Sequence, residues 1–142
     1  MTKDVKVNGF SVLVFRIALS FIFILAGISH LVQPEKVAGR IGEAAFKGFA
    51  TFFGDAYLLG LLSGYALLIC GVTFMLGLYV RHSALILAAL LIPITITIQL
   101  GNGPMHGPLW KNVALFGGLL FFIINNPPGY NIKNSITKIS QS

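Results

Sequence analysis

Hydrophobic residues gather along the chain in four long runs that polar connections separate. The runs cover residues 10–31, 56–79, 83–100 and 109–124. A helix needs about 20 predominantly apolar residues to cross a bilayer, and these runs have close to that length. The pattern predicts an all-α membrane protein whose four transmembrane helices form a bundle.

The connection between the first two runs is too polar to cross a membrane but keeps a helical period. Pro34 suits the first turn of a helix. Apolar residues recur at helical spacing at Val37, Ile41, Ala45, Phe49 and Phe52, and the charged residues Lys36, Arg40, Glu43 and Lys47 take other faces. We therefore expect an amphipathic helix over about residues 34–53 that lies in the membrane interface or caps the bundle.

Composition supports a chain that is embedded in the membrane over most of its length. Hydrophobic residues make up 56% of the 142 residues and charged residues only 10%, whereas soluble domains carry about 25% charged residues. We expect one integral membrane domain, residues 1–142, with no separate soluble domain. The net charge is +6, but lysine and arginine are spread over connections and tails, which favours membrane orientation over nucleic-acid binding.

An even number of spans puts both termini on the same side of the membrane. Six basic residues fall on that side, Lys3, Lys6, Arg16, Arg81, Lys133 and Lys138, and four fall on the other, Lys36, Arg40, Lys47 and Lys111. The positive-inside rule then predicts cytoplasmic termini.

Arg16 is a charge inside the first apolar run. Such a charge costs about 2.5–3.5 kcal/mol at the centre of a transmembrane helix. On a helix its stripe contains Ser20, Phe23, Gly27 and His30. The side chain either reaches back toward the head groups or faces the interior of the bundle, and the shared stripe favours the interior.

Three glycines of the second run, Gly60, Gly64 and Gly71, share one helix face. Gly60 and Gly64 form a G-x-x-x-G pair, which lets two membrane helices approach closely. We expect this face to pack against another helix of the bundle or against another subunit.

Polar residues are expected to meet at the membrane side opposite the termini. Pro93 should kink the third helix, and the connection GNGPMHGPLWKN follows that helix. By topology His30, Gln99, Asn102, His106, Trp110 and Asn112 can converge there, and Arg16 and Lys111 complete our set of candidate ligand-binding residues.

Two histidines on one membrane side leave three interpretations: a metal or haem site, a quinone head-group site, or hydrogen bonds within the fold. Metal sites show clusters of ligands at defined spacing, and none is visible, so we expect no metal. The single cysteine, Cys70, cannot form an intrachain disulfide. No catalytic residue stands out, and we expect no catalysis by this chain alone.

Several segments together resemble the DoxX family of small four-span bacterial membrane proteins. They are the early Arg16, FILAGISHLVQPEK, the glycine-rich second run that ends in GLYVRHSA, and HGPLWKNVALFGGLLFF. The resemblance runs from about Phe10 to Tyr130. It implies a four-helix bundle, and some members resemble subunits of oxidoreductase systems, a thiosulfate:quinone oxidoreductase among them, while wider relatives resemble chaperones or cargo receptors.

The resemblance also assigns polar positions. Arg16, His30, Arg81, Lys111 and Asn112 match recurrent polar positions of the family, with His30 where many members have lysine. Leu67 stands where many have glutamate, so the resemblance implies that leucine replaces a likely acidic partner of Arg16.

Three functions remain open at this point. The first is an accessory subunit that scaffolds or assembles a larger partner in the bacterial cytoplasmic membrane, in contact with lipid and with a larger membrane protein or further copies of itself. The second is a quinone-binding subunit of a membrane oxidoreductase, with quinone as the cofactor. The third, a small-solute transporter, is less favoured because no pair of broken helices is visible.

Overall fold

The computed structural model describes residues 4–127 and 139–140. The long helices are α1 (Gly9–Val32), α4 (Ala56–Leu76), α5 (Val80–Ile94) and α6 (Gly107–Asn125). Two short helices, α2 (Pro34–Glu43) and α3 (Lys47–Thr51), connect α1 to α4. A π-helical turn η1 (Thr95–Gln99) and a 3-10 turn η2 (Leu100–Asn102) continue α5. The described residues contain no strand.

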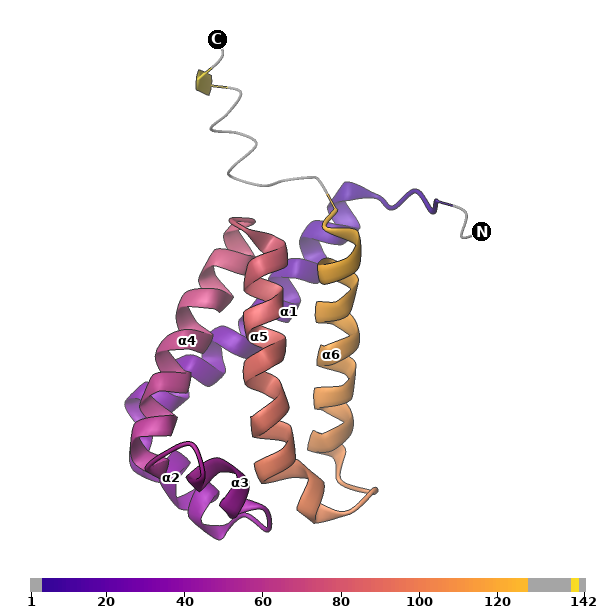
Figure 1. Cartoon of the computed structure of the whole chain (residues 1–142). Helices are drawn as coiled ribbons and strands as arrows, with labels where there is room; N and C mark the ends of the chain where they lie inside the picture. The colour runs from indigo at the N-terminus through magenta and orange to yellow at the C-terminus, as the bar shows by residue number, and fades with distance from the viewer. Residues whose placement is uncertain (1–3, 128–138, 141–142) are drawn as a thin grey trace.

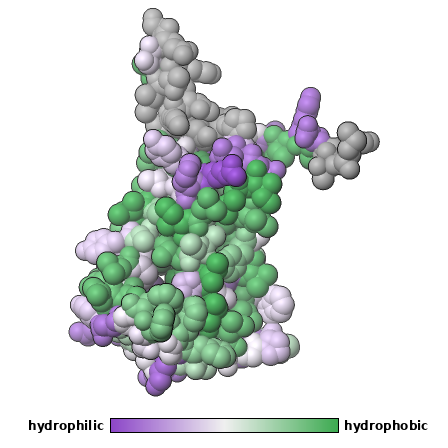
Figure 2. Space-filling model, viewed as in Figure 1, coloured by the Kyte–Doolittle hydropathy of each residue, from purple (hydrophilic) through white to green (hydrophobic). Residues whose placement is uncertain are grey.

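The four long helical segments are apolar enough and long enough to cross a membrane, which confirms the predicted four-helix membrane protein. Figure 1 shows α1 beginning and α6 ending at the same end of the bundle, which we call the terminal end. Helices α2 and α3 and the α5–α6 connection lie at the opposite, connector end. Hydrophobic residues dominate the visible surface between the two ends (Figure 2).

Local capping places the helix ends a few residues away from those predicted. Helix α4 ends at Leu76 rather than at residue 79, because Gly77 adopts φ 76°, a left-handed conformation that glycine takes without strain. The third span begins at Val80 instead of residue 83, and α6 begins at Gly107 instead of residue 109. Asn8 and Asp55 cap α1 and α4 by accepting hydrogen bonds from backbone N–H groups of the first turn.

The prediction of a single amphipathic helix over residues 34–53 is wrong, because this segment forms two helices, α2 and α3. The chain turns extended at Ala44, with φ −67° and ψ 143°, so α2 ends there and α3 begins at Lys47. Only the first part of the predicted apolar period is buried: Val37 and Ile41 pack with Ala50 in a small cluster over the connector end. The later members of the period, Ala45, Phe49 and Phe52, are exposed.

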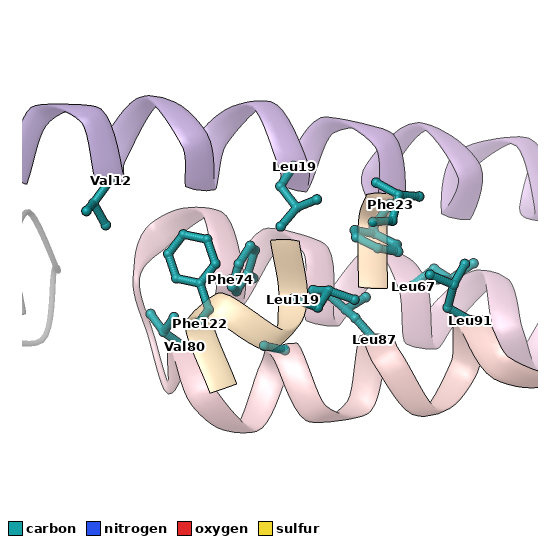
Figure 3. Packing of buried hydrophobic residues seen from close by; sticks show 12 residues of the cluster. Val12, Leu19, Phe23, Leu67, Phe74, Val80, Leu87, Leu91, Leu119 and Phe122 are labelled. Carbon is teal, nitrogen blue, oxygen red and sulfur yellow. The ribbon is translucent and has the colours of Figure 1, made fainter. Parts of the chain in front are cut away.

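The main core forms where the four long helices meet. Figure 3 shows Phe23 of α1, Leu67 and Phe74 of α4, Leu87 of α5 and Leu119 of α6 directed toward one another. The rings of Phe74 and Phe122 meet edge to face at 4.9 Å between centroids, a favourable aromatic arrangement. This core holds the bundle together and leaves a hollow nearer the connector end.

Candidate functional site

A cavity of about 420 Å³ lies between α4 and the α5–η1 segment, with α2 and α3 along its side. Its volume falls within the range of about 300–1,000 Å³ typical of ligand sites. Leu62 and Phe53, 57% and 63% exposed, line it, so it communicates with the outer surface of the bundle. The walls are apolar except for three side chains, His30, Ser63 and Thr97.

His30 projects from the last turn of α1 and is fixed by α4. Its Nδ1 lies 2.9 Å from the Ser63 hydroxyl oxygen and 3.3 Å from the Gly60 carbonyl oxygen. The Ser63 hydroxyl in turn donates to the same carbonyl at 2.9 Å. The absence of a side chain at Gly60 and Gly64 leaves room for this contact, because the Cβ of His30 would be only 2.8 Å from a Cβ added at Gly64.

The helix opposite His30 departs from α geometry just after Pro93. Proline has no N–H, so the backbone loses one helical hydrogen bond at this point. The next turn widens to π geometry, in which the N–H of Leu100 bonds to the carbonyl of Thr95, five residues back. π-turns inside helices are rare and occur frequently at functional sites.

The π-turn buries two threonines on opposite faces. Thr95 is 9% exposed and turns toward α6, where its hydroxyl accepts a hydrogen bond from Asn112 Nδ2 at 2.9 Å. Thr97 is 3% exposed and lines the cavity. Its hydroxyl has no hydrogen-bond partner among the described residues. Neither Thr97 nor Ser63 was predicted from the sequence to line a site. The one signal was the run of β-branched residues after Pro93, which does not suit a regular helix.

Asn112 and Thr95 form a buried polar link between α5 and α6, and we expect them to be energetically coupled. Thr95 also donates to the Leu91 carbonyl at 2.7 Å, so its hydroxyl both donates and accepts a hydrogen bond. A double-mutant cycle of Thr95→Val and Asn112→Leu, followed by unfolding in detergent, should give a coupling near 0.6 kcal/mol and at most about 1.7, the range for such bonds in membrane proteins. Strictly additive single effects would contradict the link.

The remaining candidates of the connector end make separate contacts. His106 Nε2 lies 2.7 Å from Gln99 Oε1, and Trp110 Nε1 donates to the Pro104 carbonyl. Asn102 bonds back to the Ile98 carbonyl, and Lys111 is exposed. None of these side chains lines the cavity. The structure therefore pairs Gln99 with His106 and Asn112 with Thr95, and it places His30 in a different site.

Arg16 is buried within the bundle near the terminal end, with 1% of its side chain exposed. It does not reach back to the surface, which removes the first of its two interpretations. Ser20 donates to its carbonyl at 2.6 Å. His30 lies about 21 Å farther along the α1 axis at about 1.5 Å per residue, so Arg16 is not part of the cavity.

The candidate packing glycines contact two different elements. A Cβ added at Gly71 would lie 2.9 Å from Ile24 Cγ1 of α1, and one at Gly60 would lie 3.1 Å from Val37 Cγ1 of α2. Gly64 also faces α1. This face is used inside the chain, between α4 and the elements that precede it.

Leu67 lies level with Gly27, because a Cβ added at Gly27 would meet the backbone of both Gly64 and Leu68. Arg16 is about 16 Å away along α1 at about 1.5 Å per residue. The position that carries glutamate in the resemblance is therefore not beside Arg16, and Leu67 instead belongs to the apolar core at 2% exposed.

The chemistry open to these residues is binding through hydrogen bonds and apolar contact. In the part of the chain that the structure describes, no group of three or more histidine, cysteine or acidic residues could hold a metal ion. Cys70 is half-buried in α4 and is a free thiol. The cavity can hold and orient an apolar molecule that carries a small polar head.

Comparisons with known proteins add one finding to this geometry. The searches of curated proteins and of solved structures returned no match. The sequence model of the family described as DoxX matches residues 11–100. This stretch spans the first three membrane helices, the connector helices and the whole lining of the cavity. Because the match covers more than half of the chain, the protein is a member of the DoxX family.

Proposed function

We propose that this chain is an accessory subunit of a membrane oxidoreductase complex and that its cavity holds a molecule of the quinone class. The cavity between α4 and the α5–η1 segment carries this proposal. A quinone needs an apolar site that opens toward lipid and offers few polar contacts to its head. The lining supplies these properties, with three polar side chains and a partly exposed edge at Leu62.

In this proposal the chain binds and positions the quinone, and a partner subunit supplies or accepts the electrons. The single cysteine cannot run a dithiol cycle within one chain. His30, Ser63 and Thr97 can hold the head, and the apolar residues of α4 and α5 can hold the ring and the start of the tail. The partner is a larger membrane protein or a further copy of this chain.

We also propose a place and an orientation: the bacterial cytoplasmic membrane, with cytoplasmic termini. The basic residues favour this orientation by six to four, although Lys3, Lys133 and Lys138 lie outside the described residues. The connector end and the cavity then belong to the outer half of the membrane. The exposed phenylalanines of the α3 region, among them Phe52 at 85%, would lie in the interface there.

The proposal predicts that a quinone copurifies with the protein. We expect chain isolated in native lipid discs to yield about one quinone per chain on solvent extraction, measured by chromatography and mass spectrometry. Ala66→Phe places a ring inside the cavity and should remove most of the quinone. Ala18→Phe adds the same ring to an exposed position of α1 and should leave the yield unchanged.

Other outcomes of that experiment count against the proposal. Quinone at the level of the surrounding lipid in the native chain, or equal quinone in the A66F and A18F proteins, would remove the cavity as a quinone site. A reproducible protein partner that still binds A66F, with no quinone in either sample, would favour a purely scaffolding subunit.

A further inference from the structure

We propose that the cavity recognises a hydroxyl group on an apolar ligand, with His30 Nε2 as the hydrogen-bond acceptor and the Thr97 hydroxyl as the second partner. This inference rests on the proposed function in so far as the cavity holds a ligand. It adds the chemistry of the head group: the site prefers a hydroquinone, or another apolar alcohol, over a quinone that offers only carbonyl oxygens.

The contacts of His30 decide which ring nitrogen carries the hydrogen. A carbonyl oxygen can only accept, so the Nδ1 contact with the Gly60 carbonyl requires a hydrogen on Nδ1. Ser63 gives the same answer, because its one hydrogen already goes to that carbonyl and its oxygen must therefore accept from His30. Both contacts place the hydrogen on Nδ1.

The other ring nitrogen is therefore an acceptor. In a neutral imidazole, Nε2 then carries the lone pair. No carboxylate lines the cavity, and a charged ring in such apolar surroundings would be costly. Among the described residues no donor bonds to Nε2, so this atom is left for a ligand that can donate a hydrogen bond.

Thr97 supplies an independent observation on the facing helix. A buried threonine in a helix usually bonds back to the carbonyl one turn earlier, as Thr95 does to Leu91. Thr97 does not, although it is 3% exposed and lines the same cavity as His30. Buried hydroxyls are nearly always satisfied. The Thr97 oxygen has almost no accessible surface in its present rotamer, so the side chain would turn toward the cavity to bond to a ligand oxygen.

A hydroxyl group can satisfy both atoms, because it donates to Nε2 and accepts from Thr97 once that side chain has turned toward the cavity. A quinone carbonyl accepts from Thr97 but leaves Nε2 without a donor. One hydrogen bond of ordinary strength corresponds to about a tenfold difference in affinity. A tenfold preference for the hydroquinone would raise the midpoint potential of the bound two-electron couple by about 30 mV, so that the bound quinone accepts electrons more readily.

The test compares the affinities of four probes for purified protein in lipid discs under argon. The probes are a decyl-substituted benzohydroquinone, its oxidised quinone, decan-1-ol and decane. We expect the hydroquinone to bind about tenfold more tightly than the quinone, and decan-1-ol more tightly than decane. Comparing the hydroquinone with decan-1-ol shows whether the hydroxyl group that the site binds belongs to a hydroquinone or to another apolar alcohol.

Two variants test whether His30 Nε2 and the Thr97 hydroxyl cause the preference for a hydroxyl group. His30→Gln offers either a donor or an acceptor, so the hydroquinone and the quinone should bind with equal affinity. Thr97→Val keeps the shape and should weaken the hydroquinone and the alcohol by about five- to tenfold. Thr73→Val removes a hydroxyl of α4 that bonds to Cys70 and Ser83 outside the cavity, and it should leave all affinities unchanged.

The outcomes separate this inference from the proposed function. Binding of the quinone as tightly as the hydroquinone by the native protein overturns the hydroxyl preference and leaves the quinone site standing. If none of the four probes binds and the cavity holds only water, both the hydroxyl preference and the quinone site are overturned. An unchanged preference in H30Q would also overturn the assignment to Nε2.

Discussion

Replacing Gly27 with leucine is expected to prevent the native pairing of α1 with α4. A Cβ at this position would lie 2.7 Å from the Leu68 backbone nitrogen and 2.9 Å from the Gly64 carbonyl oxygen. Both are backbone atoms, so they cannot rotate away as a side chain would. Extra methylenes in a packed interior cost about 1–3 kcal/mol when the surroundings can adjust, and here they cannot adjust without separating the helices.

We expect Gly27→Leu to lose its monodisperse peak in size-exclusion chromatography and Gly27→Ala to lower the melting temperature in detergent. Gly117→Ala and Gly117→Leu are the matched controls, because Gly117 is exposed on α6 and a Cβ there meets nothing within 4 Å. At this exposed helical position alanine is also more favourable than glycine by about 1 kcal/mol, so the Gly117→Ala control should not lose stability. Native stability of Gly27→Leu would show that α1 and α4 do not approach this closely.

The consequence of this close approach extends to the cavity. His30 lies less than one turn beyond Gly27, and its ring is set by Gly60 and Ser63 of α4. A wider separation of the two helices would move His30 away from both partners. We therefore expect Gly27→Ala to lower ligand affinity as well as stability.

The membrane helices could be predicted from the sequence because their signal is long and repeated. A run of apolar residues near 20 in length allows few other structures. The ends were less predictable, since a few residues with special conformations decide them. Gly77 ends α4 within a run that stays apolar, and Ala44 interrupts a helical period that continues on both sides.

The candidate site was predicted less completely because it depends on a departure from regular geometry. His30 was identified from the sequence. The residues predicted to lie beside it were chosen because they share its side of the membrane and because the third helix was treated as regular. Pro93 was expected to kink that helix, and the π-turn that follows also buries Thr95 and Thr97 on opposite faces. A rotation about the helix axis cannot be read from the spacing of residues when the period itself changes.

Leu67→Glu is expected to destabilise the protein strongly. Leu67 is 2% exposed and packs in the main core (Figure 3). It lies level with Gly27 of α1. The change removes buried apolar contacts and buries a carboxyl group, whose combined cost is on the order of 3–5 kcal/mol even when the acid is neutral. Thermal unfolding in detergent should show a large decrease in melting temperature. Leu67→Met nearly conserves volume, and we expect it to cost less than about 1.5 kcal/mol.

The same variant tests whether Arg16 can serve as the partner of an acid at position 67. The distance of about 16 Å along α1, at about 1.5 Å per residue, argues that it cannot. In that case Arg16→Met should change the stability of L67E by no more than it changes that of the native chain, because distant sites are additive. If L67E is as stable as the native protein, and Arg16→Met destabilises L67E much more than it destabilises the native chain, then α1 and α4 pack in a different register from the one described.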